Sequence, residues 1–471
     1  MAFLLLSHIH PTKQFMARLS GRALCVSCTE SALRFRPCDD DPSRKISTLA
    51  TIRASISLML MAIFDKSFIH GITADEAAVF DMHFMSNITP LFFVEVLADL
   101  EKSDVTSDEG RTALVRSLAG KTPVYHSYPN IPHAQIVLGE LLGYPLELRN
   151  VPVVGGGRRV QTAEGLATVF DEPPEMKAKS RWHSGKFEDQ EYALAKAWRD
   201  MLQTAPLSME RLFGGSASRF TFRDLDTVKQ SVDELLDRDG VRFKTLKAAL
   251  ETLGIPSEYH PTIIARWKAS GGPRFRGFAP YAAHVLTVNM FRVLAMASGL
   301  ISPDKTSNYA DMAYLYYLPF CEVFISADRL HKRCVPLFMK ERQAFVWAHD
   351  LRPVLAQLVD QYLATPDIEE AGLIGVAQRT TFSADSFIGA LQDRLHPRRR
   401  MSEPDLAPKM SLEAQKALVE RLNAIRESPP VEPGVDLEQE DRSTSFTRMV
   451  PPRRGRFAFM PKTSRNDVGE D

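Results

Sequence analysis

Two acidic residues, Asp65 and Asp328, come just after apolar segments that are typical of buried β-strands. The run 58–64 is apolar throughout and is followed directly by Asp65. A second short predicted strand, 322–325, is followed by Ser326 and then by Asp328. In open parallel α/β sheets, ligands bind outside the carboxyl ends of the strands. The spacing therefore predicts that both carboxylates reach the ligand-binding edge of a parallel sheet.

Two further acidic residues occupy related places in the predicted fold. Glu95 lies at the start of the helix after a second apolar run, 88–94, and Asp311 opens the helix before the late strand. If both halves of the chain share one sheet, the carboxylates converge and repel one another unless a cation neutralises them. Mg²⁺ or Mn²⁺ prefers such oxygen ligands and can activate water for phosphodiester hydrolysis. The predicted metal ligands and catalytic residues are Asp65, Glu95, Asp311 and Asp328.

The ordered set of acids resembles the PIN-like nuclease domain family. In that family an Asp follows the first strand, a Glu lies in the helix after the second strand, and a last motif connects a helix-opening Asp to Ser/Thr-x-Asp. Here the last motif runs from Asp311 to Ser326 and Asp328. The resemblance implies a three-layer α/β/α parallel sheet and metal-dependent cleavage of RNA, or occasionally DNA. It also implies that the four acids bind the metal and that Ser326 supports them by hydrogen bonding, with Ser67 as a second supporting residue.

The residue after Asp65 departs from the family pattern. The family usually has Thr or Ser followed by Asn there, whereas this chain has Lys66 and Ser67. The Lys66 ammonium could occupy the space where the charge of a metal ion is needed. A second hypothesis is therefore a catalytically inactive PIN-like scaffold or binding protein that acts through its helical insertion. Asp65, Asp311 and Asp328 could also each be only a helix or turn cap, a role that Asp often takes.

The hydrophobic pattern divides the chain into two halves of one domain, an insertion and terminal segments. The strand–helix–strand–helix pattern near the start predicts a right-handed βαβ crossover. The insertion is expected to select the substrate or to gate access to the site. The predicted boundaries are 1–56 for a disordered or misassigned extension, 57–101 and 281–365 for the two halves of the PIN-like domain, 102–280 for a mostly helical insertion, 366–426 for a helical segment and 427–471 for a disordered tail.

Helical periodicity predicts most of the remaining elements. Thr73 and Glu76 have the spacing of a capping box at the start of one helix. A β-hairpin is predicted from 151–154 and 159–161, with the glycines 155–157 as its turn. The predicted helices are 74–86, 111–118, 132–142, 188–203, 222–236, 242–253, 281–298, 330–341, 345–363, 371–396 and 411–426.

Composition limits the classes of partner and compartment. The chain of 471 residues has 58 Lys+Arg and 58 Asp+Glu, so its net charge argues neither for nor against nucleic-acid binding. Its five cysteines do not suit a secreted disulfide framework, which predicts a reducing, cytoplasmic setting. No apolar run approaches the roughly 18 residues that a membrane span needs. The expected partners are an RNA or DNA substrate and, in the second hypothesis, another protein, with no membrane association.

Other polar residues near the motifs are expected to have ordinary roles. Asp99 is predicted to be a solvated acid and His331 a surface histidine, whereas Glu322 is a weaker alternative to Asp328 as a ligand. The basic and aromatic residues of the tail are predicted to be solvated rather than bound to nucleic acid. These are Arg453, Arg454, Arg456, Phe457 and Phe459.

Overall fold

The computed structural model describes residues 59–396 apart from 103–104, 106, 149, 163–164 and 214–220, together with 412–431, 441–446, 450–460 and 462. The predicted extension 1–56 and parts of the predicted tail thus lie outside the described residues. Within the described ranges, no helix combines the length and the apolar character needed to cross a bilayer.

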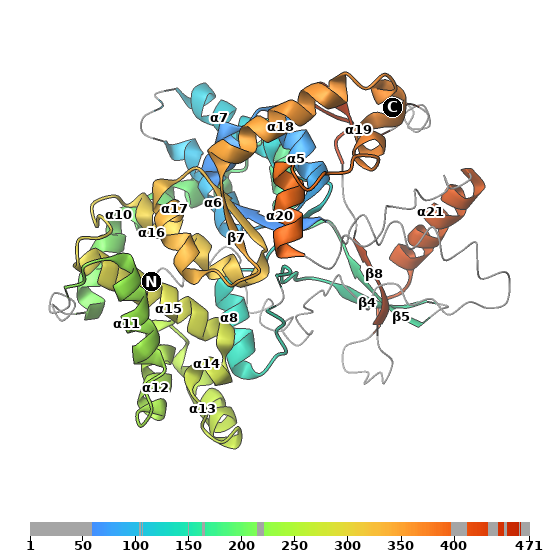
Figure 1. Cartoon of the computed structure of the whole chain (residues 1–471). Coiled ribbons are helices and arrows are strands. Elements are labelled where there is room, and N and C mark those ends of the chain that lie inside the picture. The colour runs from blue at the N-terminus through green and yellow to red at the C-terminus, as the bar shows by residue number, and fades with distance from the viewer. Residues whose placement is uncertain are drawn as a thin grey trace.

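A five-stranded parallel sheet forms the centre of the molecule (Figure 1). Its spatial order is β3 (Ser127–Pro129), β2 (Phe84–Ile88), β1 (Leu60–Phe64), β6 (Val323–Ser326) and β7 (Ala344–Trp347). Every neighbouring pair of these strands runs parallel. Every residue of β1, β2 and β6 is buried, as parallel strands covered on both faces require. The predicted α/β class with a parallel sheet and helical additions is confirmed.

The direction of strand order reverses between β1 and β6. From β1 the chain moves outward through β2 to β3, and it later returns to β6 on the other side of β1. Phe64 pairs in register with Ile325, so the residues that follow these two strands emerge side by side. Such a reversal point is where open α/β sheets bind ligands.

Helices on both faces of the sheet complete three layers. Right-handed crossovers place the helices that join β1, β2 and β3 on one face, and the segment that returns from β3 to β6 on the other. The predicted capping box is present, because the Thr73 hydroxyl accepts the N–H of Glu76 and the Glu76 carboxylate accepts that of Thr73. The first layer contains α4 (Lys66–Gly71), α5 (Ala74–His83), α6 (Pro90–Leu97), η2 (Ala98–Glu101) and α7 (Asp108–Lys121).

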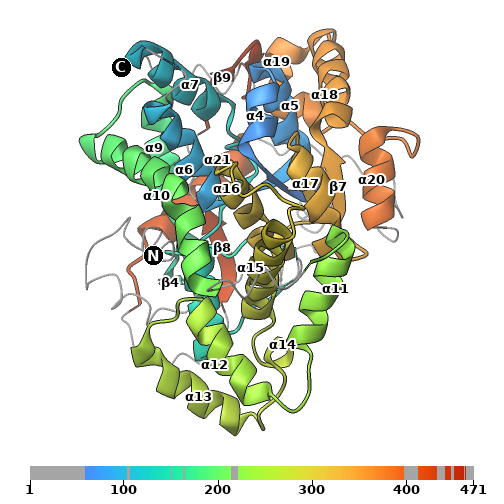
Figure 2. The same ribbon diagram turned by 90° about the vertical axis from the view of Figure 1, so that its left-hand side faces the viewer.

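The long segment between β3 and β6 is mostly helical, and Figure 2 shows that α11 to α14 extend away from the sheet. The strand β3 itself comes from the range predicted as the insertion. The helices of this segment are α8 (His133–Leu142), α9 (Pro174–His183), α10 (Asp189–Phe213), α11 (Leu225–Leu236), α12 (Arg242–Thr252), η4 (Ser257–Tyr259), α13 (His260–Ala269), α14 (Phe275–Phe278), α15 (Pro280–Ala297), α16 (Ser307–Ala313) and η5 (Tyr314–Phe320).

A second, three-stranded sheet lies beside the main body (Figure 1). Its strands β4 and β5 are antiparallel, and β8 adds to β5 in parallel. The predicted hairpin is wrong, because the glycines 155–157 precede β4 instead of forming the turn between two strands. The elements of this sheet are β4 (Arg158–Thr162), β5 (Gly165–Phe170) and β8 (Asp441–Phe446), with α21 (Leu412–Glu427) packed on β5.

The second strand of the main sheet lies earlier than predicted. The run 88–94 is not a strand, because β2 ends at Ile88 and α6 begins at Pro90. The hydroxyl of Thr89 accepts the N–H of Phe92 and so caps the helix, while proline at the first helical position is already locked in a helical φ. A short apolar run is compatible with a buried helix as well as with a buried strand.

The fifth strand was predicted as part of the helix that follows it. Residues 345–347 belong to β7, and α18 (Ala348–Leu363) begins only after them, whereas the sequence predicted one helix over 345–363. The predicted helix 330–341 is shorter, and it divides into α17 (Arg329–Cys334) and η6 (Val335–Phe338). Pro336, which lacks a backbone N–H, falls at this division.

Part of the predicted tail packs against the sheet domain. The antiparallel pair of β9 (Arg453–Arg454) and β10 (Phe457–Ala458) contacts α5 and α19 (Ile368–Ala377). Phe457 and Phe459 are buried, and the buried Arg454 forms an ion pair with Asp81. The prediction of solvated side chains is therefore wrong for Arg454, Phe457 and Phe459, whereas Arg453 and Arg456 are exposed as predicted. The remaining helix near the C-terminus is α20 (Phe387–Leu395).

Candidate functional site

Asp65 lies immediately beyond β1 and is 3% exposed. Its Oδ1 accepts the backbone N–H of Phe68 at 3.1 Å and thereby caps α4. The Ser67 hydroxyl donates to the same carboxylate, 2.7 Å from Oδ1, and the Ser326 hydroxyl donates to Oδ2 at 2.9 Å. A buried carboxylate needs such donors to offset its lost hydration. Both serines predicted to support the site thus bind Asp65.

Ser326, the last residue of β6, connects Asp65 to the start of α17. Its Oγ accepts the backbone N–H of Asp328 at 2.9 Å and lies 2.9 Å from Nδ1 of His331. Pairing of β1 with β6 produces this arrangement, since the backbone N–H of Asp65 donates to the carbonyl of Ile325 at 3.3 Å. The strand ends are therefore joined by side chains as well as by the sheet.

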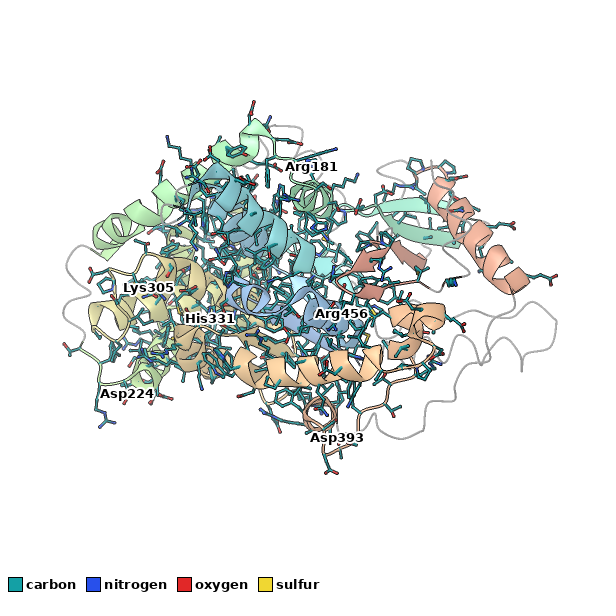
Figure 3. All side chains as sticks on the ribbon, turned by 90° about the horizontal axis from the view of Figure 1, so that it is seen from above. Arg181, Asp224, Lys305, His331, Asp393 and Arg456 are labelled. Atoms are coloured by element: carbon teal, nitrogen blue, oxygen red, sulfur yellow. The ribbon has the colours of Figure 1, made fainter. Side chains whose placement is uncertain are left out.

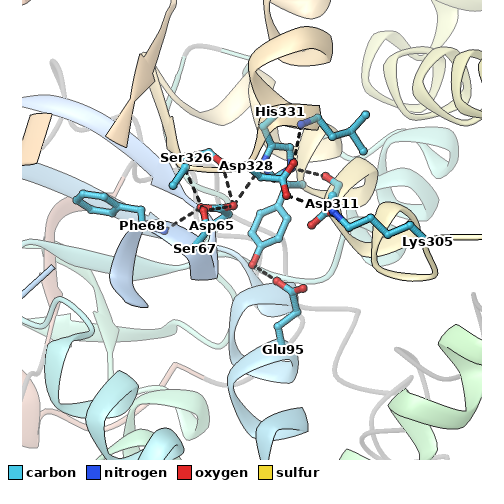
Figure 4. Close-up of polar contacts among 12 residues, drawn as sticks. Asp65, Ser67, Phe68, Glu95, Lys305, Asp311, Ser326, Asp328 and His331 are labelled. Carbon is cyan, nitrogen blue, oxygen red and sulfur yellow. Dashed lines mark hydrogen bonds and ion pairs between the residues drawn. The ribbon is translucent and has the colours of Figure 1, made fainter. Parts of the chain in front are cut away.

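Asp328 and Asp311 share a lysine neighbour (Figure 4). Asp328 caps α17 through Oδ1, which accepts the N–H of Leu330 at 2.6 Å. The Lys305 ammonium lies 3.5 Å from Oδ2 of Asp328 and 3.9 Å from Oδ2 of Asp311. The side chain of Lys305 is 55% exposed, so this contact between charges is screened by solvent.

Asp311 differs from its prediction in one respect. It does not open a helix, because α16 begins at Ser307 and Asp311 lies within it, facing the other acids. Its Oδ2 is buried without a hydrogen-bond partner among the described residues. Burial raises the pKa of Asp311 to about 7; the charges of Glu95 and Asp328 act in the same direction, while that of His331 opposes them. The charged neighbour of this oxygen is thus Lys305, at 3.9 Å, without a hydrogen bond between them.

Glu95 lies in the second turn of α6 rather than at its start. Its Oε2 accepts a short hydrogen bond from the hydroxyl of Tyr314, with 2.5 Å between the oxygens. Burial raises the pKa of Glu95, although the charge of Lys66 and the bond from Tyr314 lower it. Tyr314 is the first residue of η5 and is fully buried, so it fixes Glu95 from the opposite layer.

Lys66 is paired with Asp99. Its ammonium lies 3.0 Å from Oδ1 of Asp99 and donates to the backbone carbonyl of Glu95 at 3.2 Å. Asp99 is 3% exposed and also lies 3.5 Å from Arg199, so the prediction of a solvated acid is wrong. The charge of Lys66 is thus compensated one helical turn beyond Glu95, on the rim of the site.

His331 is completely buried, contrary to the predicted surface position. Its Nε2 donates to the backbone carbonyl of Asp311 at 2.7 Å, and its Nδ1 lies 3.3 Å from Oδ2 of Asp65. Burial by itself would lower the pKa of His331, but the hydrogen bond to Asp65 and the charges of Asp65 and Asp311 raise it to about 9. Because each ring nitrogen faces an acceptor, the doubly protonated imidazolium suits this environment.

The structure brings the four predicted acids to one edge of the sheet from four separate segments (Figure 4). Their oxygen atoms have the chemistry that Mg²⁺ or Mn²⁺ requires, and Oδ2 of Asp311, which has no hydrogen bond among the described residues, offers one such donor. In the described part of the chain, however, no three His, Cys, Asp or Glu side chains form a ready-made metal-ligand group. The donor chemistry fits a divalent cation, provided that Lys305 withdraws and the carboxylates close around the ion.

No protein-family model, curated protein or solved structure matches this chain.

Three residues that contact the acids were not predicted from the sequence to belong to the site. They are His331, Tyr314 and Lys305, and none has a motif that marks it. The position of His331, three residues after Asp328, was the available signal, because a helix turn places such residues on one face. Glu322, the weaker alternative ligand, lies just before β6 and so at the opposite end of that strand from Asp328. It accepts the N–H of Met61 and contacts His396 there.

Figure 3 shows His331 and Lys305 in one part of the molecule and Arg456, which belongs to the C-terminal segment, in another. The packing of residues 450–460 is thus separate from the acidic edge.

Proposed function

We propose that this chain is a metal-dependent nuclease that hydrolyses phosphodiester bonds in RNA. The observation that carries the proposal is the convergence of four carboxylates at the point where strand order reverses, next to β1 and β6. Reversal points are the ligand-binding edges of parallel sheets. Several buried acids at one place, not all of them paired with an opposite charge, lower the stability of the fold. Their presence therefore favours a functional role.

The PIN-like resemblance belongs to the same proposal. It is supported by the sheet order with β1 at its centre and by the Ser326 hydroxyl bound to the first acid. The residues that would hold Mg²⁺ or Mn²⁺ are Asp65, Glu95, Asp311 and Asp328. The ion would supply Lewis-acid stabilisation of charge on the phosphate and a water of lowered pKa.

The chain's own residues would keep these acids in place. Ser67 and Ser326 orient Asp65, and Tyr314 orients Glu95, so these two acids are held in place before a cation arrives. His331 compensates the charge of Asp65 before binding. The buried free thiols Cys321 and Cys334 suit the reducing, cytoplasmic setting that we propose with this activity.

A second candidate function is a non-catalytic PIN-like protein that binds a partner through its helical insertion. The observation that favours it is the supply of positive charge within the site itself. His331 lies beside Asp65, and Lys305 lies beside both Asp311 and Asp328. If these cations persist, no divalent ion is required to balance the acids.

The deciding experiment is cleavage of a short labelled single-stranded RNA in the presence of Mn²⁺. The proteins compared would be the wild type, Asp328→Asn, Asp65→Asn and a matched control, Asp226→Asn, at an exposed position in α11. Cleavage by the wild type and the control that EDTA stops, and that both site variants lose, supports the nuclease.

Equal cleavage by Asp328→Asn and the wild type would assign the activity to a contaminant and overturn the proposal. Absence of cleavage, together with a melting temperature that Mn²⁺ does not raise, would also overturn it in favour of the non-catalytic function. Ligands that bind only the folded state raise the melting temperature, so this readout does not depend on catalysis.

A further inference from the structure

We propose that Trp347, His349 and Lys332 form a base-stacking subsite for single-stranded nucleic acid beside the acidic edge. The inference rests on the proposed nuclease function and specifies how its substrate strand is held. These three residues are called the indole platform below. They come from the end of β7, the start of α18 and the middle of α17.

The indole platform adjoins the acidic site through the sheet. Trp347, the last residue of β7, is the register partner of Ser326, whose hydroxyl binds Asp65. Adjacent strands lie about 4.8 Å apart. Trp347 therefore lies at the same edge of the sheet as the acids, with β6 between its strand and β1. A nucleotide next to the phosphate at the acids would therefore be near this ring.

The three side chains form a layered contact. The Lys332 ammonium lies 4.6 Å from the centroid of the Trp347 ring. The ring of His349 lies 5.1 Å from that of Trp347, centroid to centroid, with 37° between their planes. His349 and Lys332 are exposed and Trp347 is half-buried, so solvent reaches the outer members of the contact.

A row of aromatic rings also connects the indole platform to the site. Trp347 contacts Phe345 at 6.4 Å between centroids, Phe345 stacks with Phe324 at 6.4 Å, and Phe324 contacts His331 at 5.1 Å. His331 in turn lies against Asp65. A rigid row of rings therefore fixes the distance between the indole and the acids.

The exposed side chains of α17, the helix that carries Lys332, include several basic groups that suit a phosphate backbone. Arg329, Lys332 and Arg333 are exposed on α17, and Arg333 donates to the carbonyl of Leu300. Asp350, in the first turn of α18, is an exposed acid next to His349 in the chain. Basic groups beside an aromatic face are the arrangement that single-strand binding proteins use, because every base has a π-face and every nucleotide a phosphate.

Lys332 has a specific role in this arrangement. In the free protein its ammonium covers the indole as a cation–π contact, a modest interaction at exposed sites. An incoming base would take that position on the ring, and the displaced ammonium would pair with the adjacent phosphate. The same side chain thus covers the ring before binding and contributes to affinity afterwards.

Binding in EDTA tests the subsite without any requirement for catalysis. The probes would be a short oligouridylate, the corresponding oligothymidylate, and a strand of equal length and charge without bases. Quenching of tryptophan fluorescence by a stacked base reports on Trp347, because a base has little access to the other three tryptophans. Trp182, Trp198 and Trp267 are at most 9% exposed. The variants would be Trp347→Ala, Trp347→Phe, His349→Ala and Lys332→Gln, with Lys244→Gln on α12 as a distant control.

If the subsite exists, both strands that carry bases should quench the fluorescence, and the abasic strand should bind weakly. Trp347→Ala should weaken binding by about tenfold or more, with Trp347→Phe in between, as loss of one stacked base implies. Lys332→Gln should lower the salt slope by about one. His349→Ala, at an exposed position, supplies a variant that does not alter the core.

Equal affinity of the abasic strand, or unchanged binding by Trp347→Ala and His349→Ala, would overturn the subsite. Absence of binding by the wild type would overturn it as well. Cleavage with Mn²⁺ is measured separately. If Trp347→Ala still cleaves RNA, the nuclease proposal stands even though the stacking subsite has failed.

Discussion

The Nδ1 atom of His331 lies 3.3 Å from Oδ2 of Asp65, and both side chains are shielded from solvent. The second ring nitrogen of His331 donates to the backbone of Asp311, so the ring joins two of the four acids. A buried charge is tolerated when a partner and hydrogen bonds compensate it. The candidate site therefore carries its own counter-charge.

Replacement of His331 by Gln should lower the free energy of unfolding by about 3–5 kcal/mol, because Asp65 is left buried without an opposite charge. Urea unfolding in EDTA would measure this loss. The double variant with Asp65→Asn should be less destabilised than the sum of the single variants, since the pair is then removed as a unit. Strict additivity would show that the two side chains are not coupled.

Replacement of Lys305 by Gln should strengthen Mn²⁺ binding by about threefold, because an exposed ammonium near two carboxylates contributes only modest repulsion toward a cation. The rise of the melting temperature with Mn²⁺ concentration gives the affinity. Lys244→Gln, which removes the same charge from α12, should leave it unchanged. If both variants change the Mn²⁺ affinity equally, Lys305 acts only through the net charge of the protein and not through its contact with the acids.

Replacement of Arg454 by Met should destabilise the protein by about 3 kcal/mol, because it removes the partner of a buried charge. Arg454 lies 3.4 Å from Asp81 and donates to the carbonyl of Thr122 at 2.9 Å. Arg456→Ala, in the same segment, breaks the exposed pair with Asp75 and should cost less than about 1 kcal/mol. Chemical denaturation of both variants would reveal whether residues 450–460 contribute to the stability of the sheet domain.

Acid should stabilise His284→Gln relative to the wild type. Burial lowers the pKa of His284 from 6.5 to about 4, although its bond to the carbonyl of Leu315 opposes the shift. The folded pKa lies below the unfolded one, so this contribution to stability is complete above pH 6.5 and is lost as the pH falls through about 4. Gln does not titrate, and it can keep the donor to Leu315.

The difference in unfolding free energy between the two proteins should therefore change by up to about 1.4 kcal/mol per pH unit between pH 6.5 and 4. Urea unfolding at several pH values measures it. The raised pKa values of Asp311 and Glu95 affect both proteins equally and cancel in the difference. A constant difference across this range would contradict the buried, neutral state of His284.

Local sequence was sufficient for the two strands that precede Asp65 and Asp328. The apolar strand before Asp65, the strand before Asp328 and the capping box at Thr73 depend on neighbouring residues only, so their pattern predicted them. Helix and strand were confused at β2 and β7, since a short buried run satisfies either structure. Asp311 was placed at a helix start because an acid is a common cap, although α16 begins earlier, at Ser307.

The sequence by itself determined that acids follow buried strands, and hence the type of site that we propose. Only the tertiary structure decided that β1 lies next to β6, because strand pairing joins residues far apart in the chain and periodicity does not specify the partner. The same pairing buries His331 between Asp65 and Asp311 and so sets its charge. Charge state follows from surroundings, which a sequence does not contain.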